Sequence, residues 1–432
     1  MMPDHKHIIT QSLIFMLKLK KIIMGFSKMD ESFPQDNSLA SAKSSGKSSR
    51  AWLVFLILGI ISMMGGVACV LVVFLMPKEV LPDLDFPAVP SAKVENKYYS
   101  HLTGLSVADE AAISTPTYCV QTPNGTDGAR PQAGLNEAGV IFEAIAEAGI
   151  TRFAAIYQNP SAAVIGPIRS LRLYYLQWDT PFDCTIVHAG GADDAIAAVR
   201  AGGYKDLSEN YYYMYRGTYG ARRWNNLFTT ADYLRKVNED WGFGGSNVTG
   251  FKRMTPANSL KARVDAGVKE KLSITEPSLS NTSIIVATVP SIAVRFGYTG
   301  SFNVNYNYDV ASNTYLRSYE SGETHGIYDC PAENLGERNP EDVCNMKQLA
   351  PSVVVAMMVE EKRAWDGYHE DITTIGSGTA YIFQNGGVIV GTWNKASVGE
   401  QIKFFDGSGA EVALAPGQTI VEAVPAYGRV EN

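Results

Sequence analysis

The sequence lacks the short motifs that identify common enzyme classes. It contains no G-x-x-x-x-G-K-[ST] phosphate loop, no G-x-S-x-G nucleophile turn, no H-E-x-x-H zinc pair and no G-x-G-x-x-G dinucleotide fingerprint. It also has no C-x-x-C pair, the spacing typical of structural zinc sites. We therefore expect neither a resident metal nor a cofactor.

A surplus of positive charge is missing from most of the chain. The formal net charge is −7, and residues 1–50 carry eight Lys or Arg against four Asp or Glu, so the remaining residues carry −11. Nucleic-acid-binding proteins need basic surfaces that neutralise phosphates. The acidic balance therefore argues against a nucleic-acid partner.

Charge is absent from Ala51–Met76, a run of 26 predominantly apolar residues. About 20 apolar residues cross a bilayer as a helix. Basic residues precede this run, which predicts a single-pass anchor in the cell membrane with a cytoplasmic N-terminus and an extracytoplasmic body. A cleaved signal peptide, or a lipoprotein signal ending before Cys69, is the alternative. Residues 1–50 resemble a basic disordered tail, and residues 77–97 a Pro-rich spacer.

Cysteine is scarce, with five residues in the whole chain. Cys69 falls in the predicted membrane segment, which leaves an even number for an oxidising compartment. Cys330 and Cys344 flank a polar loop and are the favoured disulfide, with Cys119 and Cys184 as the remaining pair. The spacing alone leaves the connectivity open.

Beyond the spacer, helical and strand patterns alternate over residues 98–245, which predicts an α/β domain with parallel crossovers. The expected helices are 137–148, 168–178, 192–201 and one starting near Thr230, and the expected strands are 151–157 and 184–189.

Residues 282–428 consist of short β-branched and aromatic runs, which predicts a β-rich C-terminal domain after a linker at 246–281. Asn385-Gly386 between two such runs is a hairpin signal. The fold class expected is thus mixed α+β: a membrane anchor, an α/β domain, then a β-rich domain.

Several sequence blocks resemble the YerB-like family of bacterial extracytoplasmic proteins, many of them lipoproteins. The blocks are ARPQAGLNEAGVIFEAIAEAGITRFAAIYQ at 129–158, IGPIRSLR at 165–172, VHAGG at 187–191, SVVVAMMV at 352–359 and GGVIVGTWNK at 386–395. The resemblance implies a two-domain envelope protein with a domain of unknown function, and it brings no catalytic residues. Two features depart from the family pattern: the cysteine-containing segment before residue 129, and the apolar span in place of a lipid anchor.

Charged side chains recur within elements that should be buried: Glu143, Glu147, Arg152, Arg169 and Arg172. On a helix, Arg169 and Arg172 would share one face, and with Arg152 they could hold a phosphate or carboxylate. The favoured alternative is a structural ion-pair network in which the arginines pair with Glu143 and Glu147. Both interpretations hold if one glutamate stays free as a base.

His188 ends a predicted strand just before two glycines, at the edge where open α/β sheets bind ligands. A metal site formed by His188, Asp193 and Asp194 is conceivable, but a hydrogen-bonded strand-end histidine is favoured. His325 and His369 are expected to be solvated in loops.

An aromatic loop at residues 211–228 could stack on sugars or contact a partner protein, through Tyr212, Tyr215, Arg222 and Trp224. A loop packed on its own domain is equally consistent with the pattern.

Two functions remain open. The first is a non-enzymatic protein that binds an envelope component (a glycan, an anionic ligand or a partner protein) at an Arg/Glu-lined cleft. The second is an envelope enzyme acting on a phosphate-containing or glycan substrate, with Arg152, Arg169 and Arg172 holding the anion and a glutamate as base. Catalysis would require a free carboxylate beside an arginine-bound anion, whereas binding would not.

Overall fold

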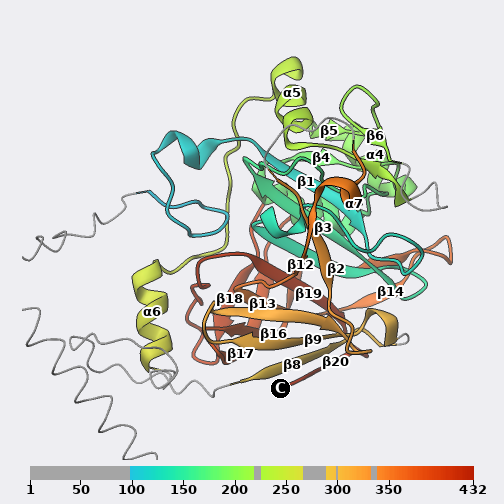
Figure 1. Ribbon diagram of the computed structural model, residues 1–432. Coiled ribbons are helices and arrows are strands. Elements are labelled where there is room, and N and C mark those ends of the chain that lie inside the picture. Colours follow the sequence, from blue (N-terminus) through green and yellow to red (C-terminus); the bar gives the residue numbers. More distant parts are fainter. Residues whose placement is uncertain (1–97, 218–224, 266–288, 298–299, 332–337) are drawn as a thin grey trace, which may run out of the picture. The chain divides into compact units, whose positions relative to one another are not determined.

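The computed structural model describes residues 98–217, 225–265, 289–297, 300–331 and 338–432 (Figure 1). Strands predominate among these residues, and helices are few and short. The fold is therefore mixed and mainly β.

Ten strands form one mixed sheet, here called the main sheet. In spatial order they are β18 (Lys403–Asp406), β17 (Gly387–Lys395), β16 (Gly376–Gln384), β13 (Val353–Val359), β19 (Thr419–Pro425), β2 (Val140–Glu147), β3 (Ile150–Gln158), β1 (Thr117–Pro123), β4 (Thr185–Val187) and β5 (Lys205–Leu207).

A second, four-stranded sheet has the order β10 (Thr314–Tyr319), β9 (Val304–Asp309), β8 (Ser291–Arg295) and β20 (Arg429–Glu431). Three strand pairs stand apart: β11 (Gly326–Asp329) with β12 (Asn345–Gln348), β14 (Glu361–Arg363) with β15 (Glu370–Ile372), and β6 (Tyr215–Arg216) with β7 (Leu227–Phe228). The α-helices are α3 (Leu173–Asp179), α4 (Asp193–Ala201), α5 (Ala231–Trp241), α6 (Pro256–Asp265) and α7 (Pro340–Val343), and the 3-10 helices are η2 (Ala111–Ser114), η3 (Leu135–Glu137), η4 (Thr180–Phe182) and η7 (Gly300–Phe302).

The centre of the main sheet joins strands from distant parts of the chain. Strand β19 pairs in parallel with β13 on one side and with β2 on the other. The register of the second pairing sets Glu422 opposite Glu143. One sheet therefore runs through both halves of the described chain.

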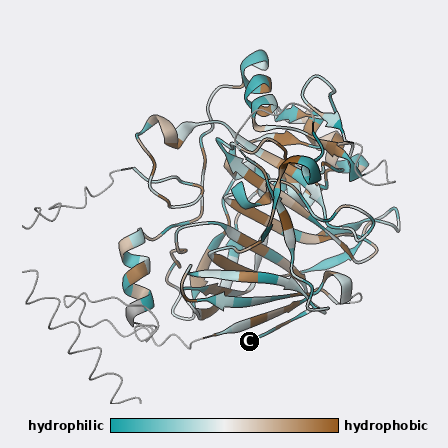
Figure 2. Cartoon of the chain, viewed as in Figure 1, coloured by the Kyte–Doolittle hydropathy of each residue, from teal (hydrophilic) through white to brown (hydrophobic). Residues whose placement is uncertain are grey.

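Two hydrophobic cores lie on opposite faces of the main sheet. In β2, Ile141 and Ile145 belong to the core that includes the second sheet and α5, whereas Phe142 and Ala144 belong to the core that includes α3 and α4. Successive side chains of a strand point to opposite faces, so a doubly covered strand is apolar throughout. Figure 2 shows hydrophobic residues along these strands and a largely hydrophilic α5.

The expected helix at 137–148 is wrong, because this segment forms strand β2. Its apolar residues fit a helical period, but a short strand buried on both faces gives the same unbroken apolar run. Gly149 follows this strand and does not terminate a helix. Ala148 and Gly149 have φ values of 49° and 76° and form the turn between β2 and β3, since two-residue hairpin turns of this kind need positive φ at both positions.

The helix expected at 168–178 begins only at Leu173, and Arg172 is its extended N-cap with φ −123°. Arg169 is thus not helical. The strands at 151–157 and 184–189, the helix at 192–201 and the helix after Thr230 are confirmed within a few residues. The Asn385-Gly386 hairpin is confirmed too, with φ values of 55° and 76°.

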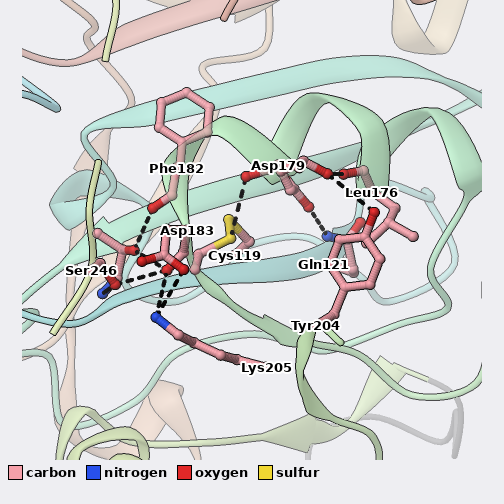
Figure 3. Close-up of a disulfide and its surroundings, with 12 residues drawn as sticks. Cys119, Gln121, Leu176, Asp179, Phe182, Asp183, Tyr204, Lys205 and Ser246 are labelled. Atoms are coloured by element: carbon pink, nitrogen blue, oxygen red, sulfur yellow. Dashed lines mark hydrogen bonds and ion pairs between the residues drawn. A yellow bond between two sulfur atoms is a disulfide. The ribbon is translucent and has the colours of Figure 1, made fainter. Parts of the chain in front are cut away.

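Both expected disulfides are confirmed: Cys119 with Cys184, and Cys330 with Cys344. The first joins β1 to the segment before β4, and both of its cysteines are buried. Figure 3 shows this bond beside Asp179, whose Oδ2 accepts a hydrogen bond of 2.9 Å from Gln121 Nε2. Burial raises the pKa of Asp179 well above its ordinary value, which favours the protonated carboxyl.

The predicted mixed fold is confirmed in its coarse form. Within the described residues, no helix has the length and apolar character needed to cross a membrane. The predicted span Ala51–Met76 lies outside them, as do the tail 1–50 and the spacer 77–97. The predicted boundary at 246–281 lies partly outside them as well, and the division into two domains stays a prediction.

Candidate functional site

Glu147 is the centre of a buried ion network on the α3 side of the main sheet. Its Oε1 accepts from Arg152 Nη2 at 2.7 Å and its Oε2 from Arg172 Nη2 at 2.6 Å. Burial alone would raise the pKa of Glu147, but the two guanidinium groups hold it below its ordinary value. One carboxylate thus fixes two arginines, as the structural interpretation of the sequence expected.

Glu143 belongs to a different network, between the main sheet and the second sheet. It forms an ion pair with Arg317 of β10, and its Oε1 also accepts from Thr151 Oγ1 at 2.6 Å and from Asn124 Nδ2 at 3.0 Å. Arg317 Nε lies 3.8 Å from Glu422 Oε1. Glu143, Arg317 and Glu422 all have fully buried side chains.

The shell of this Glu143 network is polar as well. Tyr306 OH accepts from Arg317 Nε at 3.0 Å and donates to Glu422. His325 accepts from Arg317 through Nδ1 and donates through Nε2 to Gln132 Oε1 at 3.0 Å. His325 is therefore buried, and the expectation that it is solvated is wrong.

Burial shifts the pKa values of two groups in the Glu143 network, Glu422 and His325. Burial, together with the neighbouring Glu143 carboxylate, raises the pKa of Glu422 well above its ordinary value. Burial and the Arg317 guanidinium lower the pKa of His325 well below its ordinary value. Both shifts favour the neutral form of the group, beside the ion pair of Arg317 with Glu143.

Glu143 and Glu147 face opposite sides of the sheet because β2 is irregular. The register between β2 and β3 shifts between Ile145 and Glu147, as at a β-bulge. A bulge turns the following side chain to the other face. The two glutamates predicted to act together are thus held apart by the thickness of the sheet.

The three predicted arginines do not converge either. Arg152 and Arg172 meet at Glu147, whereas Arg169 lines a separate hollow beside Ala189 and Arg216. The physical reason is the extended backbone of this segment, since the shared helix face of Arg169 and Arg172 does not exist.

His188 is a buried, hydrogen-bonded histidine directly after β4. Its Nδ1 lies 2.7 Å from Gly190 O and its Nε2 lies 2.8 Å from Asp206 Oδ1. Its carboxylate partner is thus Asp206, whereas the metal hypothesis required Asp193 and Asp194. Within the part of the chain that the structure describes, no group of three or more His, Cys, Asp or Glu side chains could hold a metal.

The aromatic loop divides into exposed and buried residues. Tyr212 is 84 % exposed, whereas Tyr215 is 4 % exposed and donates from its hydroxyl to Arg338 O at 2.7 Å. Arg222 and Trp224 lie outside the described residues.

A cleft of about 610 Å³, here called the hairpin cleft, opens between the start of α4 and the β14–β15 hairpin. A backbone bridge between Glu147 and His369 ties this hairpin to the end of β2. The lining residues are Arg172, Leu173, Tyr174, Gly191, Ala192, Asp193, Asp194, Lys362, Arg363, Ala364, Trp365, Asp366, His369, Glu370 and Asp371.

The walls of the hairpin cleft are charged, and its rim is aromatic. Lys362 lies 3.3 Å from Asp371 across the hairpin, and Asp193 and Asp194 stand in the first turn of α4. Trp365 is 84 % exposed, which is unusual for so large an apolar ring. The cleft therefore combines an apolar face with acidic groups, and it includes Arg172 from the predicted set.

Sequence reasoning missed the partners of Glu143 and the contribution of the β14–β15 hairpin to the cleft. The missed residues of the network are Arg317, Glu422, Tyr306, Asn124 and Gln132. A signal existed for two of them, because Arg317 alternates with Tyr315 and Tyr319 on the inner face of its strand and Glu422 interrupts an apolar run.

Replacing Arg317 by Met should lower the free energy of unfolding by about 3–5 kcal/mol, because it leaves Glu143 buried without its cation. Adding Glu143→Gln should restore part of this loss, since the uncompensated charge is then removed. Urea unfolding of the two single variants and the double variant measures both effects. Strictly additive losses would contradict the coupling described above.

A second prediction concerns Glu361 of the β14–β15 hairpin. Burial raises its pKa to about 7, a hydrogen bond from Tyr427 opposes this shift, and Glu370 adds to it. The folded chain therefore keeps a proton that the unfolded chain loses near pH 4.3, so this contribution to stability is complete below about pH 4 and is lost as the pH rises through about 7.

Glu361→Gln should accordingly flatten the dependence of unfolding free energy on pH between about pH 5 and pH 7. Urea unfolding at several pH values in this window checks the change. Parallel pH profiles for the variant and the parent would show that Glu361 does not hold this proton.

Comparisons with known proteins agree with this architecture. The family model "Protein of unknown function (DUF3048) N-terminal domain" matches residues 102–244, and the corresponding C-terminal domain matches residues 292–421. The two matches together cover more than half of the chain.

One curated relative is "Putative lipoprotein YerB" of Bacillus subtilis (strain 168), which is 28 % identical over 345 residues, with 78 % of this chain and 89 % of the relative covered. The crystal structure of YerB protein from Bacillus subtilis matches with a TM-score of 0.59 at 22 % identity, covering 78 % of this chain and all of that one. This structural similarity supports the fold described above. The chain therefore belongs to the YerB-like family, defined by the N- and C-terminal DUF3048 domains.

Proposed function

We propose that this protein is anchored in the cell membrane, faces outward, and binds an envelope component in the hairpin cleft. Three observations support the location: the uncharged run Ala51–Met76, two disulfides of the kind that persist in oxidising compartments, and a relative named as a putative lipoprotein.

The observation that carries the binding role is the exposed Trp365 at the rim of an acidic cleft. A volume of about 610 Å³ lies within the usual range for small-molecule sites. Two contacts fix the wall of the cleft. Arg172 forms an ion pair with Glu147 of β2, and a backbone bridge from Glu147 to His369 joins the β14–β15 hairpin to the same strand. A preorganised wall reduces the entropy lost on binding.

The chemistry of the cleft favours a hydroxyl-rich glycan. Carboxylates such as Asp193 and Asp194 accept hydrogen bonds from hydroxyl groups, and an indole offers a flat apolar surface to a sugar ring. The same carboxylates repel a phosphate at the start of α4. A glycan of the envelope is therefore our preferred ligand.

An enzyme acting on phosphate-containing or glycan material is the alternative. It would need an arginine-bound anion beside a free carboxylate, yet Arg152 and Arg172 both pair with Glu147, and Glu143 pairs with Arg317. These pairings favour binding over catalysis at the predicted residues.

Trp365→Ala should weaken binding to purified peptidoglycan about tenfold or more, because an exposed aromatic anchor typically contributes at least 1–2 kcal/mol. Co-sedimentation of the full-length protein in detergent measures this. Tyr212→Ala is the matched control, since Tyr212 is equally exposed but does not line the cleft. Equal binding by the Trp365 variant and the parent would refute the cleft, and a loss confined to the Tyr212 variant would place the site in the aromatic loop.

Membrane attachment has its own test, because a lipid on Cys69 would anchor the chain without a span. Cys69→Ser should leave the protein in the membrane fraction of Bacillus subtilis cells, whereas deletion of residues 51–76 should abolish attachment. Release of the Cys69→Ser variant into the soluble fraction would identify a lipid anchor instead.

A further inference from the structure

A second hollow, of about 630 Å³, lies between the segment before α3 and strands β6 and β7. It shares no lining residue with the hairpin cleft. Its lining residues are Ile168, Arg169, Ala189, Glu209, Arg216, Asn226 and Leu227. We call it the Arg169 pocket.

One of the two arginines in this pocket is fully engaged. Arg216 Nη2 donates to Glu209 Oε1 at 2.6 Å, and Arg216 Nη1 donates to Asn226 Oδ1 at 3.0 Å. Its Nε donates to Tyr211 OH at 2.9 Å. Among the described residues that line the pocket, Glu209 supplies the only carboxylate, and its ion pair with Arg216 neutralises both charges.

Arg169 is in the opposite situation. Its Nε is shielded from solvent without an acceptor, and no side chain of the described residues pairs with its guanidinium group. Its backbone is nonetheless fixed, because its N–H donates to Gln121 O at 2.8 Å and its carbonyl accepts from Ala189 N at 3.0 Å. Arg152 and Arg172 also have an Nε without an acceptor, but both pair with Glu147 through a terminal nitrogen.

A shielded donor without an acceptor is costly and uncommon in folded proteins. Since Arg216 and Glu209 neutralise each other, the described lining of the pocket carries one excess positive charge, that of Arg169. A guanidinium group binds phosphate and carboxylate oxygens in a bidentate manner. Ile168, Ala189 and Leu227 add an apolar wall, which suits an oxyanion carried on a small organic group.

We propose that the Arg169 pocket binds a small oxyanionic ligand, a phosphate or a carboxylate, with Arg169 as its principal cationic contact. The site is independent of glycan binding in the hairpin cleft, because the two hollows have separate linings. The protein would thus bind an anionic ligand in the Arg169 pocket in addition to a hydroxyl-rich glycan in the hairpin cleft.

The test is isothermal titration calorimetry of the full-length protein in detergent, with inorganic phosphate and with acetate as separate probes at constant ionic strength. Saturable binding of at least one probe is expected, and Arg169→Gln should weaken it at least tenfold. Binding of phosphate alone, of acetate alone or of both would identify which oxyanion the pocket accepts. The matched control is Arg200→Gln, which removes an exposed arginine of α4 that does not line the pocket.

A purely structural Arg169 would behave differently. Because its side chain has no described partner, Arg169→Gln should leave the melting temperature unchanged without the probe and remove only the rise that the probe causes. Arg169→Lys should bind more weakly than the parent, since the charge remains but the fork is lost. Absence of saturable binding of both probes, equal binding by Arg169→Gln, or a lower melting temperature of that variant without any anion would overturn the proposal.

Discussion

The pairing of β19 with β2 is the contact on which the rest of the structure depends. It joins a strand near the end of the chain to one near the start of the described region, and it makes a single sheet of both. It also sets Glu422 opposite Glu143, so that two carboxyl groups face the second sheet together. Arg317 on that second sheet bridges them. One backbone register thus determines both the sheet and the charged centre above it.

Buried charged side chains lie on both faces of this sheet: the Glu143 network on one face and the Glu147 network on the other. Between the two sheets, the Glu143 network is closed from solvent and pairs Glu143 with Arg317, which suits a role in fixing the position of the second sheet. On the other face, Glu147 pairs with Arg172, which lines the hairpin cleft, and forms the backbone bridge to the hairpin. The bulge before Glu147 separates the two arrangements. A local irregularity of one strand therefore allows one segment to contribute both to the packing between the sheets and to the wall of the hairpin cleft.

The sequence was informative where local chemistry decides the structure. Asn385-Gly386 implies its hairpin turn through positive φ, and the polar loop between Cys330 and Cys344 pointed to their disulfide. Local patterns failed at β2, because a strand covered on both faces has no distinguishing period and its glutamates look like one helical face. The partners of Glu143 could not be predicted either, since Arg317 is 174 residues away and only the tertiary fold brings the two together.

The shared sheet has a consequence for how the chain must be made. Until β19 has been synthesised, β2 has no neighbour on one side, and its backbone N–H and C=O groups form an open edge that can recruit another chain. Almost the entire described region is therefore synthesised before the centre of its sheet closes. A chaperone that shields this edge would be most needed at that stage, and a prematurely truncated chain would be a natural target for proteases.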